Sequence, residues 1–481
     1  MKFEPVINLI GLLLCTLSVF MLVPAIVDFF LNSGDWPAFL ASSFITLFVG
    51  AGLYLSSRGN KSEHLELRQA FLLTNFAWIS ISIFGSLPFL FSELNMSFVD
   101  AIFESTSGIT TTGATVILNL EQTSSGILLW RALLQWLGGI GIIVMAIAIL
   151  PMLSIGGMQL FKTESYETPE KVVPRAAIFA SGISIVYGTL TLIWTLMLWG
   201  VGMPIFDAVA HAMTTLATGG YSTKSNSLAA FQSFYIELII TFGMIVGSLP
   251  FVHYLSITKN GWKNLLKDEQ VKWFLILVII LVLLVSLNLY YQGTNLLDSI
   301  RLALFNVVSI LTGTGYGTAD FSEWGGFVTT LLLMLMFIGG CAGSTTCGLR
   351  MARIQVLIAN AKTQIYKLLS PHAVVVPYYN KKPIPETVAE SVMGFFFLYI
   401  LSFAIISCLL GSLGLDFMTA ISGAASAIGN VGPGLGEVIG PTGTFNSIPD
   451  LGKILLCLGM ILGRLEIFAI LVMFSPSFWK N

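Results

Sequence analysis

The chain has 481 residues, of which 55% are hydrophobic and only 10% are charged, and its formal net charge is −2. An ordinary soluble domain is about 25% charged. This composition therefore excludes a soluble enzyme, a nucleic-acid-binding protein and a disordered scaffold. The 46 glycines and 35 phenylalanines suit helices that pack closely inside lipid. The sequence predicts an all-α integral membrane protein.

Ten apolar runs are long enough to cross a bilayer, which takes about 20 residues. They lie at 6–30, 37–57, 69–92, 126–153, 175–202, 233–257, 273–292, 326–347, 387–412 and 451–475. Shorter apolar stretches lie between some of these runs, at 98–110, 204–217, 298–312 and 415–428. Each is too short to cross and leads into a Gly/Thr-rich segment, which is typical of a re-entrant loop.

The distribution of charge predicts the orientation of the chain. Most of the 23 basic residues lie near the termini or in the loops 58–68, 162–175, 259–272 and 350–382. Because cytoplasmic loops carry the excess of Lys and Arg, both termini are predicted to be cytoplasmic, and the four short segments enter from outside. The outer loops carry most of the acidic residues, including Glu104, and Arg131 is one of their few basic residues. An acidic mouth attracts cations.

The four short segments compare well with one another. Aligned on Gly113, Gly219, Gly315 and Gly432, they recur about every 100 residues, which predicts four related units. A second glycine follows each of these in the next span, at Gly138, Gly247, Gly339 and Gly463. We therefore predict four span–pore-loop–span repeats in a pseudo-fourfold arrangement plus an N-terminal two-helix extension, with boundaries at 1–60, 65–160, 172–258, 270–370 and 384–477.

Four such units around one axis would form a pore for cations. Backbone carbonyls can replace the hydration shell of a cation, and the short helices would point their partly negative C-terminal ends inward. Glycine allows the backbone angles that a filter needs and leaves the hole open. The predicted filter residues are Thr111, Thr112, Gly113, Ala217, Thr218, Gly219, Gly313, Thr314, Gly315, Asn430, Val431 and Gly432. The alternative is that these are turns that only reverse the chain.

These segments resemble the filter sequences of the superfamily of K⁺ transporters: TTTGAT at 110–115, ATGGYST at 217–223, TGTGYG at 312–317 and GNVGPG at 429–434. GRLEIFAIL at 463–471 and the extra N-terminal span pair resemble its TrkH branch. The resemblance covers essentially the whole chain.

The resemblance implies K⁺ uptake across the bacterial inner membrane through a channel-like pore, with K⁺ at the filter residues as the permeant ion. Rb⁺, Cs⁺ and Na⁺ are further candidate ions, and no covalently bound cofactor is implied. The resemblance also implies a homodimer in membrane lipid, regulated by a cytoplasmic nucleotide-binding subunit similar to TrkA. In the alignment above, Val431 replaces the threonine that precedes the other three glycines. The loops also share only one aligned glycine, whereas a tetrameric K⁺ channel repeats a full T-V-G-Y-G. These departures predict fewer well-formed ion sites and weaker discrimination between K⁺ and Na⁺.

Two features of the predicted spans call for an explanation. Arg464 lies in the middle of 451–475, where a bare arginine costs about 2.5 kcal/mol or more. Segment 339–348, GGCAGSTTCG, interrupts 326–347 with small and hydroxyl residues, and irregular backbone at this depth must be buried in protein or line a cavity. We predict a gating loop below the filter that Arg464 holds closed, formed by Gly339, Gly340, Gly343, Ser344, Thr345, Thr346 and Gly348. The family resemblance implies the same.

The alternatives for these two features are structural. Arg464 could form a buried ion pair with another span, and 339–348 could be a stripe of small residues where helices pack closely. Asp100 and Asp207, at matching positions in two of the short segments, are predicted to cap helix N-termini.

The alternative function is a secondary transporter that couples K⁺ to H⁺ or Na⁺. Such proteins use broken helices and a carboxylate buried in a span, for which Glu466 is the clear candidate. Nothing in the sequence indicates an enzyme, because no nucleophile–base set or phosphate-binding loop is present and the four histidines lack metal-ligand spacing. The basic segment 350–382 suits either a docked partner or anionic lipid.

Overall fold

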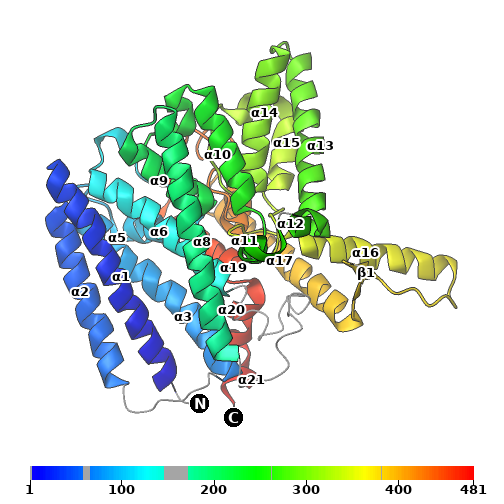
Figure 1. Ribbon diagram of the computed structural model, residues 1–481, viewed down its shortest axis with the longest axis horizontal. Coiled ribbons are helices and arrows are strands. Elements are labelled where there is room, and N and C mark those ends of the chain that lie inside the picture. The colour runs from blue at the N-terminus through cyan, green and yellow to red at the C-terminus, as the bar shows by residue number, and fades with distance from the viewer. Residues whose placement is uncertain (1–2, 58–65, 146–171, 262, 381, 481) are drawn as a thin grey trace.

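The computed structural model describes residues 3–57, 66–145, 172–261, 263–380 and 382–480, and these residues are mostly helical (Figure 1). The first half of the chain forms α1 (Glu4–Leu31), α2 (Trp36–Ser56), α3 (Leu67–Gly85), α4 (Leu87–Phe91), α5 (Phe98–Ile109), α6 (Ser125–Val144), α8 (Val172–Gly200), α9 (Ile205–Leu216) and α10 (Phe234–Gly247). The second half begins with α11 (Phe251–Asn260), α12 (Lys263–Lys267), α13 (Glu269–Tyr291), α14 (Leu296–Leu311), α15 (Gly325–Leu335) and α16 (Met351–Leu369). It ends with α17 (Glu386–Ser412), α18 (Phe417–Gly429), α19 (Asp450–Arg464), α20 (Ile467–Phe474) and α21 (Pro476–Trp479).

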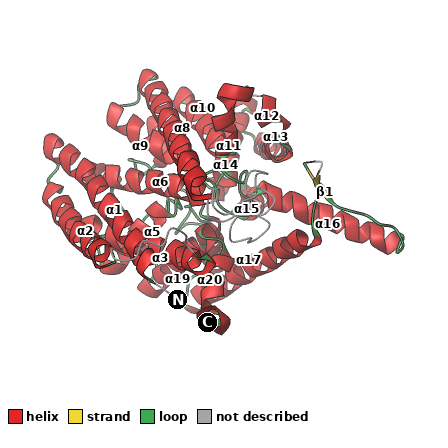
Figure 2. Cartoon of the chain, turned by 60° about the horizontal axis from the view of Figure 1, so that its bottom comes forward, coloured by secondary structure: helices red, strands yellow, loops and turns green. Residues whose placement is uncertain are grey.

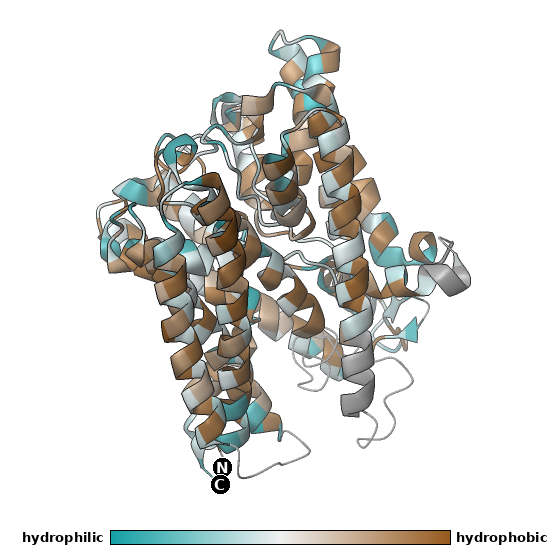
Figure 3. Ribbon diagram, turned by 60° about the vertical axis from the view of Figure 1, so that its left-hand side comes forward, coloured by the Kyte–Doolittle hydropathy of each residue, from teal (hydrophilic) through white to brown (hydrophobic). Residues whose placement is uncertain are grey.

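The N-terminal helices α1 and α2 form a hairpin, and α1 packs against α3 and α6 (Figure 1). The two backbones meet at Gly11 and Gly50, where an added Cβ on Gly11 would lie 2.8 Å from the carbonyl oxygen of Gly50. Small residues allow this approach because lipid supplies no hydrophobic force between helices. The long helices are largely hydrophobic along their length (Figure 3). Some of their apolar side chains, such as Phe44 and Phe48, are exposed. Such side chains suit contact with lipid.

Four units follow the hairpin, each with a long helix, a short helix, an irregular loop and a second helix. The short helices are α5, α9, α14 and α18, and they confirm the four short segments that hydropathy separated from the spans. The described ends of the chain meet at one end of the molecule, where Arg68 donates from Nη1 to the carbonyl oxygen of Lys480 at 2.7 Å (Figure 1). The opposite end is called the outer end below, and the end with the termini the inner end.

Seven helices in the described residues are long and apolar enough to cross a membrane, and the pair α19–α20, bent by 110°, would make an eighth. The seven match predicted spans, although the end of 126–153 lies outside the described residues. The predictions of continuous spans at 233–257, 326–347 and 451–475 are wrong. The first breaks at Pro250, which lacks a backbone N–H, and α15 stops at Leu335. The third turns at Glu466, whose φ is +62°.

The basic segment 350–382 is not an irregular loop. It forms α16, which extends away from the bundle, and a two-stranded hairpin of β1 (Tyr378–Tyr379) and β2 (Lys382–Pro383) (Figure 2). The basic segments 58–68 and 162–175 lie largely outside the described residues, so their predicted orientation stays a prediction.

Candidate functional site

The loops that follow the four short helices share one backbone pattern. Each has two residues with positive φ separated by one residue: Thr111 and Gly113, Thr218 and Gly220, Gly313 and Gly315, Asn430 and Gly432. The intervening residue donates its N–H to a carbonyl of the preceding short helix. These bonds run from Thr112 to Ser107, from Gly219 to Thr214, from Thr314 to Ser309 and from Val431 to Ser426, at 2.9–3.0 Å. The four loops are therefore copies of one structure.

This pattern corrects the sequence alignment by one residue in the second loop. The counterpart of Gly113, Gly315 and Gly432 is Gly220, not Gly219, because Gly220 has the positive φ of +75°. Ala217 consequently lies outside the matching triplets, and Gly220 joins them. Gly219 is the counterpart of Thr112, Thr314 and Val431, so it is wrong that only the fourth loop lacks a threonine there. Two consecutive glycines made the register ambiguous in the sequence.

The four matching glycines form a closed ring. A Cβ added to Gly113 would overlap the carbonyl oxygen of Gly219, one on Gly220 that of Thr314, and one on Gly315 that of Val431. The ring closes at Gly432, where the added atom would lie 2.7 Å from the carbonyl oxygen of Thr112. Each loop thus lies against the next with no room for a methyl group. Independent chain-reversing turns would not produce this cyclic contact.

Three of the four left-handed positions before the ring glycines are not glycine. Thr111, Thr218 and Asn430 adopt φ values of +49° to +54°, which costs about 1–2 kcal/mol per residue. All three are buried. Strained backbone of this kind persists only where its surroundings over-determine it, and it clusters at functional sites.

Hydroxyl groups support the first and third loops. Thr110 and Thr112 share a hydrogen bond of 2.7 Å between their Oγ1 atoms, and Thr312 and Thr314 share an equivalent bond of 2.7 Å. The fourth loop has a different support, because Nδ2 of Asn430 donates to Oγ1 of Thr112 at 2.8 Å and to the carbonyl oxygen of Met460 at 3.0 Å. The fourth loop is therefore tied to the first.

A buried ion pair lies behind the loops. Nε of Arg131 lies 2.7 Å from Oε1 of Glu104, and both side chains are at most 1% exposed. Glu104 accepts a hydrogen bond from the backbone N–H of Val116 in the first loop, and Arg131 donates to the carbonyl oxygen of Ser222 in the second. The prediction that these two charges belong to the outer loops is wrong, because both lie in helices and are buried. The signal was available, since Arg131 interrupts the apolar run LLWRALL.

The two aspartates predicted to cap short helices lie in first turns but bond elsewhere. Ser97, not Asp100, is the N-cap of α5. Oδ1 of Asp100 lies 2.5 Å from Nζ of Lys453, and Oδ1 of Asp207 accepts from Oγ1 of Thr223 at 2.7 Å. Their negative charge still lies at the partly positive end of each helix.

Segment 339–348 forms a closed, non-helical lobe, so the interpretation as a helix-packing stripe is wrong. Its base is joined by two backbone bonds, from Gly339 N–H to the Leu349 carbonyl at 2.9 Å and from Leu349 N–H to the Phe337 carbonyl at 2.8 Å. Ser344, Thr345 and Thr346 are fully buried in it. The irregular backbone of the lobe is thus buried in protein, which such backbone requires inside a membrane.

The lobe fills the break between α10 and α11. Cys341 N–H donates to the carbonyl of Ser248 at 3.0 Å, Thr345 N–H to that of Gly247 at 3.2 Å, and Phe251 N–H to that of Gly343 at 3.0 Å. The carbonyls that α10 leaves unpaired at its C-terminus therefore find partners in the lobe.

The lobe also contacts the inner side of the second loop. Oγ1 of Thr345 donates to the carbonyl oxygen of Leu216 at 3.1 Å, and Oγ1 of Thr218 lies 3.0 Å from Oγ1 of Thr345. Segment 339–348 thus lies directly below the residues that precede the glycine ring.

Arg464 joins three units below the ring. Its Nη1 donates to the carbonyl oxygen of Thr345 at 3.1 Å and to Sγ of Cys347 at 2.7 Å, and its Nη2 donates to the carbonyl oxygen of Gly138 at 2.9 Å. The side chain is 1% exposed. In the described part of the chain no carboxylate lies within ion-pair distance of Arg464, so its interpretation as one half of a buried ion pair is wrong.

Glu466, the carboxylate considered for ion coupling, pairs with arginines at the start of α16. Its Oε2 accepts a hydrogen bond from Nη2 of Arg353, and its Oε1 lies 3.8 Å from Nη1 of Arg350. The guanidinium of Arg353 also lies over the ring of Phe395, 4.0 Å from its centroid. All three charged groups are at most 5% exposed.

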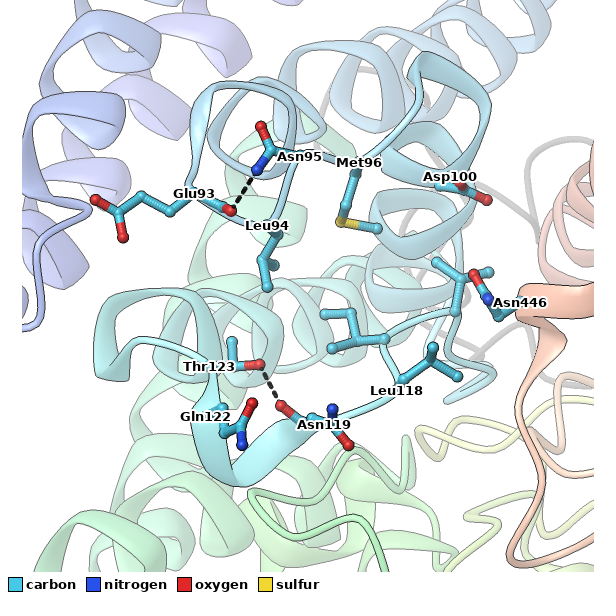
Figure 4. Close-up of a pocket in the computed structure, with 12 residues that line it drawn as sticks. Glu93, Leu94, Asn95, Met96, Asp100, Leu118, Asn119, Gln122, Thr123 and Asn446 are labelled. Atoms are coloured by element: carbon cyan, nitrogen blue, oxygen red, sulfur yellow. Dashed lines mark hydrogen bonds between the residues drawn. The ribbon is translucent and has the colours of Figure 1, made fainter.

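A cavity of about 390 Å³ opens at the outer end of the first unit (Figure 4). Glu93, Asp100, Asn119 and Gln122 are among its lining residues, and Thr123 donates to the carbonyl of Asn119 across one side. No residue of the glycine ring lines it. The described residues hold no group of three His, Cys, Asp or Glu side chains that could bind a metal ion.

The fold and these loops define a class: membrane proteins with four units of long helix, short helix and loop, whose loops meet in a ring. A family model described as a cation transport protein, TrkH, matches residues 36–481. The chain therefore belongs to the TrkH family.

Similar proteins extend over the whole chain. The Trk system potassium uptake protein TrkI of Halomonas elongata is 40% identical, covering 100% of this chain and 98% of that protein. The Trk system potassium uptake protein TrkH of Vibrio parahaemolyticus is 39% identical, with both chains fully covered. The crystal structure of the potassium transporter TrkH from Vibrio parahaemolyticus matches with a TM-score of 0.92, at 37% identity and 100% coverage of both chains.

Proposed function

We propose that this protein takes up potassium across the bacterial inner membrane through a channel-like pore whose selectivity filter is the four-loop ring. The observation that carries the proposal is the closed contact between each ring glycine and the carbonyl of the next loop. Carbonyl groups brought together in this way can replace the hydration shell of K⁺. The names of the relatives from Halomonas elongata and Vibrio parahaemolyticus support potassium as the ion.

The same proposal assigns a gating role to segment 339–348 and Arg464. Thr345 contacts the inner side of the second loop, and Arg464 bonds to the lobe from the fourth unit. A positive charge directly below a cation filter opposes the passage of K⁺, and the lobe occupies space below the ring. Opening then requires that Arg464 releases the lobe.

The proposal also covers the orientation of the protein in the membrane and its partner subunits. Both termini lie at the inner end and are assigned to the cytoplasm, because the basic residues gather there. A homodimer in membrane lipid and a TrkA-like nucleotide-binding subunit complete the assembly. The helix α16, which follows the lobe directly and extends from the bundle, is a suitable element for such a subunit to pull.

Coupling of K⁺ to H⁺ or Na⁺ is the competing function. It would use Glu466, but that carboxylate is already neutralised by Arg353 and lies near Arg350. Loss of one partner of a buried ion pair is costly, so this carboxylate is poorly suited to bind and release a coupling ion. Passive permeation is therefore the better-supported function.

The test is flux of ⁸⁶Rb⁺ and K⁺ into liposomes that hold the purified protein, with no gradient of H⁺ or Na⁺. We expect uptake by the unmodified protein and a loss of K⁺ preference over Na⁺ in Gly315→Ser, whose φ of +83° and contact with Val431 tolerate no side chain. Gly326→Ser is the matched control, because an added Cβ there meets nothing within 4 Å. Uptake that occurs only with a H⁺ or Na⁺ gradient would overturn passive permeation and favour coupling.

A further inference from the structure

The second loop lacks the internal support of the first and third. Its residues Ala217 and Gly219 occupy the positions at which Thr110 and Thr112 share a hydroxyl hydrogen bond. Neither alanine nor glycine can form such a bond. The loop nevertheless has the same backbone as the others, with positive φ at Thr218 and Gly220. Another group must therefore hold it.

That group is the side-chain amide of Gln135 on α6. Its Nε2 donates to the carbonyl oxygen of Gly219 at 2.6 Å, and its Oε1 accepts from the backbone N–H of Tyr221 at 3.1 Å. Both ends of the amide thus bind the second loop, one on each side of Gly220. Gln135 is fully buried, so no water competes for these bonds.

Gln135 also explains why residue 219 is a glycine. An added Cβ on Gly219 would overlap the Cδ atom of Gln135. The side chain of Gln135 therefore occupies the volume that a threonine side chain fills at the matching position of the first and third loops. Gly219 and Gln135 therefore form a complementary pair. The absence of a side chain at Gly219 leaves room for Gln135, and the amide of Gln135 replaces the hydrogen bond that a threonine would make.

The other units have a different residue at the position of Gln135. In three units the second helix passes its short helix at a glycine, where an added Cβ on Gly138, Gly247 or Gly463 would meet the carbonyl oxygen of Ile109, Leu216 or Ile428. Three residues before these glycines lie Gln135, Met244 and Met460. Methionine has no hydrogen to donate. The amide support is thus confined to the second loop in these three units.

We propose that Gln135 is a positioning residue that holds the carbonyl of Gly219 in the ring and so contributes to the preference for K⁺ over Na⁺. The inference rests on the proposed function, because it gives the ring its role as a filter. Gln135 acts through the loop backbone, away from the ion. Without its amide, the second loop loses both bonds that flank Gly220, and the carbonyl of Gly219 turns from its place against Gly113.

The experiment compares ⁸⁶Rb⁺ and ²²Na⁺ flux into liposomes for the unmodified protein and for Gln135→Met, which installs the residue of the second and fourth units. We expect the Rb⁺/Na⁺ ratio to fall on the order of tenfold, the effect of losing hydrogen bonds to one buried group. Gln135→Leu has no amide and therefore removes both bonds to the second loop at a similar side-chain volume, and we expect the same direction of change. It provides the measurement if the methionine variant fails to fold.

The double variant Gln135→Met/Gly219→Thr separates positioning from simple packing. It recreates the pairing of threonine with methionine and fills the space left by the amide. We expect it to regain part of the lost Rb⁺/Na⁺ ratio. Met244→Leu is the matched control at the same position of the second unit, and it should keep the unmodified ratio because the swap conserves volume.

Two results are informative in different ways. An unmodified ratio in folded Gln135→Met, or an equal loss in Met244→Leu, would overturn the role of Gln135 and leave the proposed function intact. Absence of K⁺ or Rb⁺ flux by the unmodified protein without a coupling ion would overturn passive permeation itself, and the role of Gln135 would fall with it.

Discussion

The outer and inner halves of the four units differ in how closely they repeat. In the outer half, four loops share one backbone pattern and meet in a ring. In the inner half, α10 breaks before α11, α15 gives way to the lobe 339–348, and α19 bends by 110° into α20. An ion on the axis needs equal surroundings, which favours repetition around it. A gate needs one element that moves past others, which favours difference.

The hydrogen bonds also differ between the outer and inner halves. The outer loops bond to their own short helices, and each lies against the next loop. The lobe of the third unit instead bonds to the second unit through Gly247 and to the fourth through Arg464. The outer half is thus held by repeated local contacts, and the inner half by single contacts between unlike partners.

The largest expected effect comes from a methyl group in the ring. Gly220→Ala places a Cβ against the backbone of Thr314 at a φ of +75°, and neither the backbone nor the added atom can move aside. We expect Rb⁺ uptake to fall by about 100-fold or more, since strain and overlap each cost on the order of 1–3 kcal/mol. Gly343→Ala, with a φ of +79° but open space around it, should retain more than half of the flux. Equal losses in both variants would contradict the closed ring.

The second comparison uses the two buried ion pairs, one in each half. Glu104→Gln removes the carboxylate that pairs with Arg131 behind the ring, and Glu466→Gln removes the carboxylate that pairs with Arg353 below the lobe. Removing one partner of a buried pair costs about 3–5 kcal/mol, so we expect both variants to melt several degrees lower in detergent. Only Glu104→Gln should reduce the Rb⁺/Na⁺ ratio, because only that pair contacts the loops.

The exposed residue Glu437 provides the control for these two variants. Glu437→Gln should change neither the melting temperature nor the ion ratio. A reduced ratio in Glu466→Gln would show that the inner half also shapes the ring, which contradicts this division between the two halves.

The third prediction concerns the lobe itself. Arg464→Met removes three hydrogen bonds that join the lobe to two other units, while keeping an unbranched, flexible side chain. We expect Rb⁺ uptake to rise about threefold to tenfold, as the loss of roughly 1 kcal/mol of closing free energy implies. The Rb⁺/Na⁺ ratio should stay unchanged, since the ring is not touched. Reduced uptake by folded protein would contradict a closing role for Arg464.

The smallest effect is expected from a substitution at Asp268, near the inner end of the molecule. Burial opposes the charge of Asp268, but hydrogen bonds from His253 and Gln270 outweigh it and hold the pKa of this carboxyl below its ordinary value. Gln270 in turn accepts from Ala342 N–H in the lobe at 3.0 Å. A lowered pKa stabilises the fold above the unfolded value of about 4, and this gain is lost as the pH falls through the folded pKa.

We therefore expect Asp268→Asn to melt about 1–3 °C below the unmodified protein at pH 7, with the difference shrinking as the pH falls below about 4. The exposed Asp450 offers a control, and Asp450→Asn should show no such pH-dependent difference. A constant difference at all pH values would mean that the carboxylate charge is not the stabilising feature.

Much of the architecture followed from hydropathy and glycine spacing. The four short helices, seven of the long spans and the N-terminal hairpin are where the sequence predicted them. Arg464 and segment 339–348 also meet, as predicted. These predictions succeeded because a helix in lipid needs a run of apolar residues, and a charge or a polar loop within it needs a partner.

The register of the second loop could not be obtained in this way. Gly219 and Gly220 are the same residue type, and only the positive φ of Gly220 and the position of Gln135 distinguish them. The breaks in the inner helices could not be predicted from the sequence for a related reason. Hydropathy averages over a window, whereas α10 ends where the lobe of another unit supplies partners for its carbonyls.

By itself, the sequence determined a helical membrane protein with four short helices, each followed by a glycine-containing loop, and a charged residue, Arg464, within an apolar run. These properties depend on local composition and on periods along the chain. The tertiary structure alone decided which glycine enters the ring, which loop the amide of Gln135 supports, and which units the lobe joins. Each of these depends on contacts between residues about 80 or more positions apart, and a one-dimensional pattern does not contain such contacts.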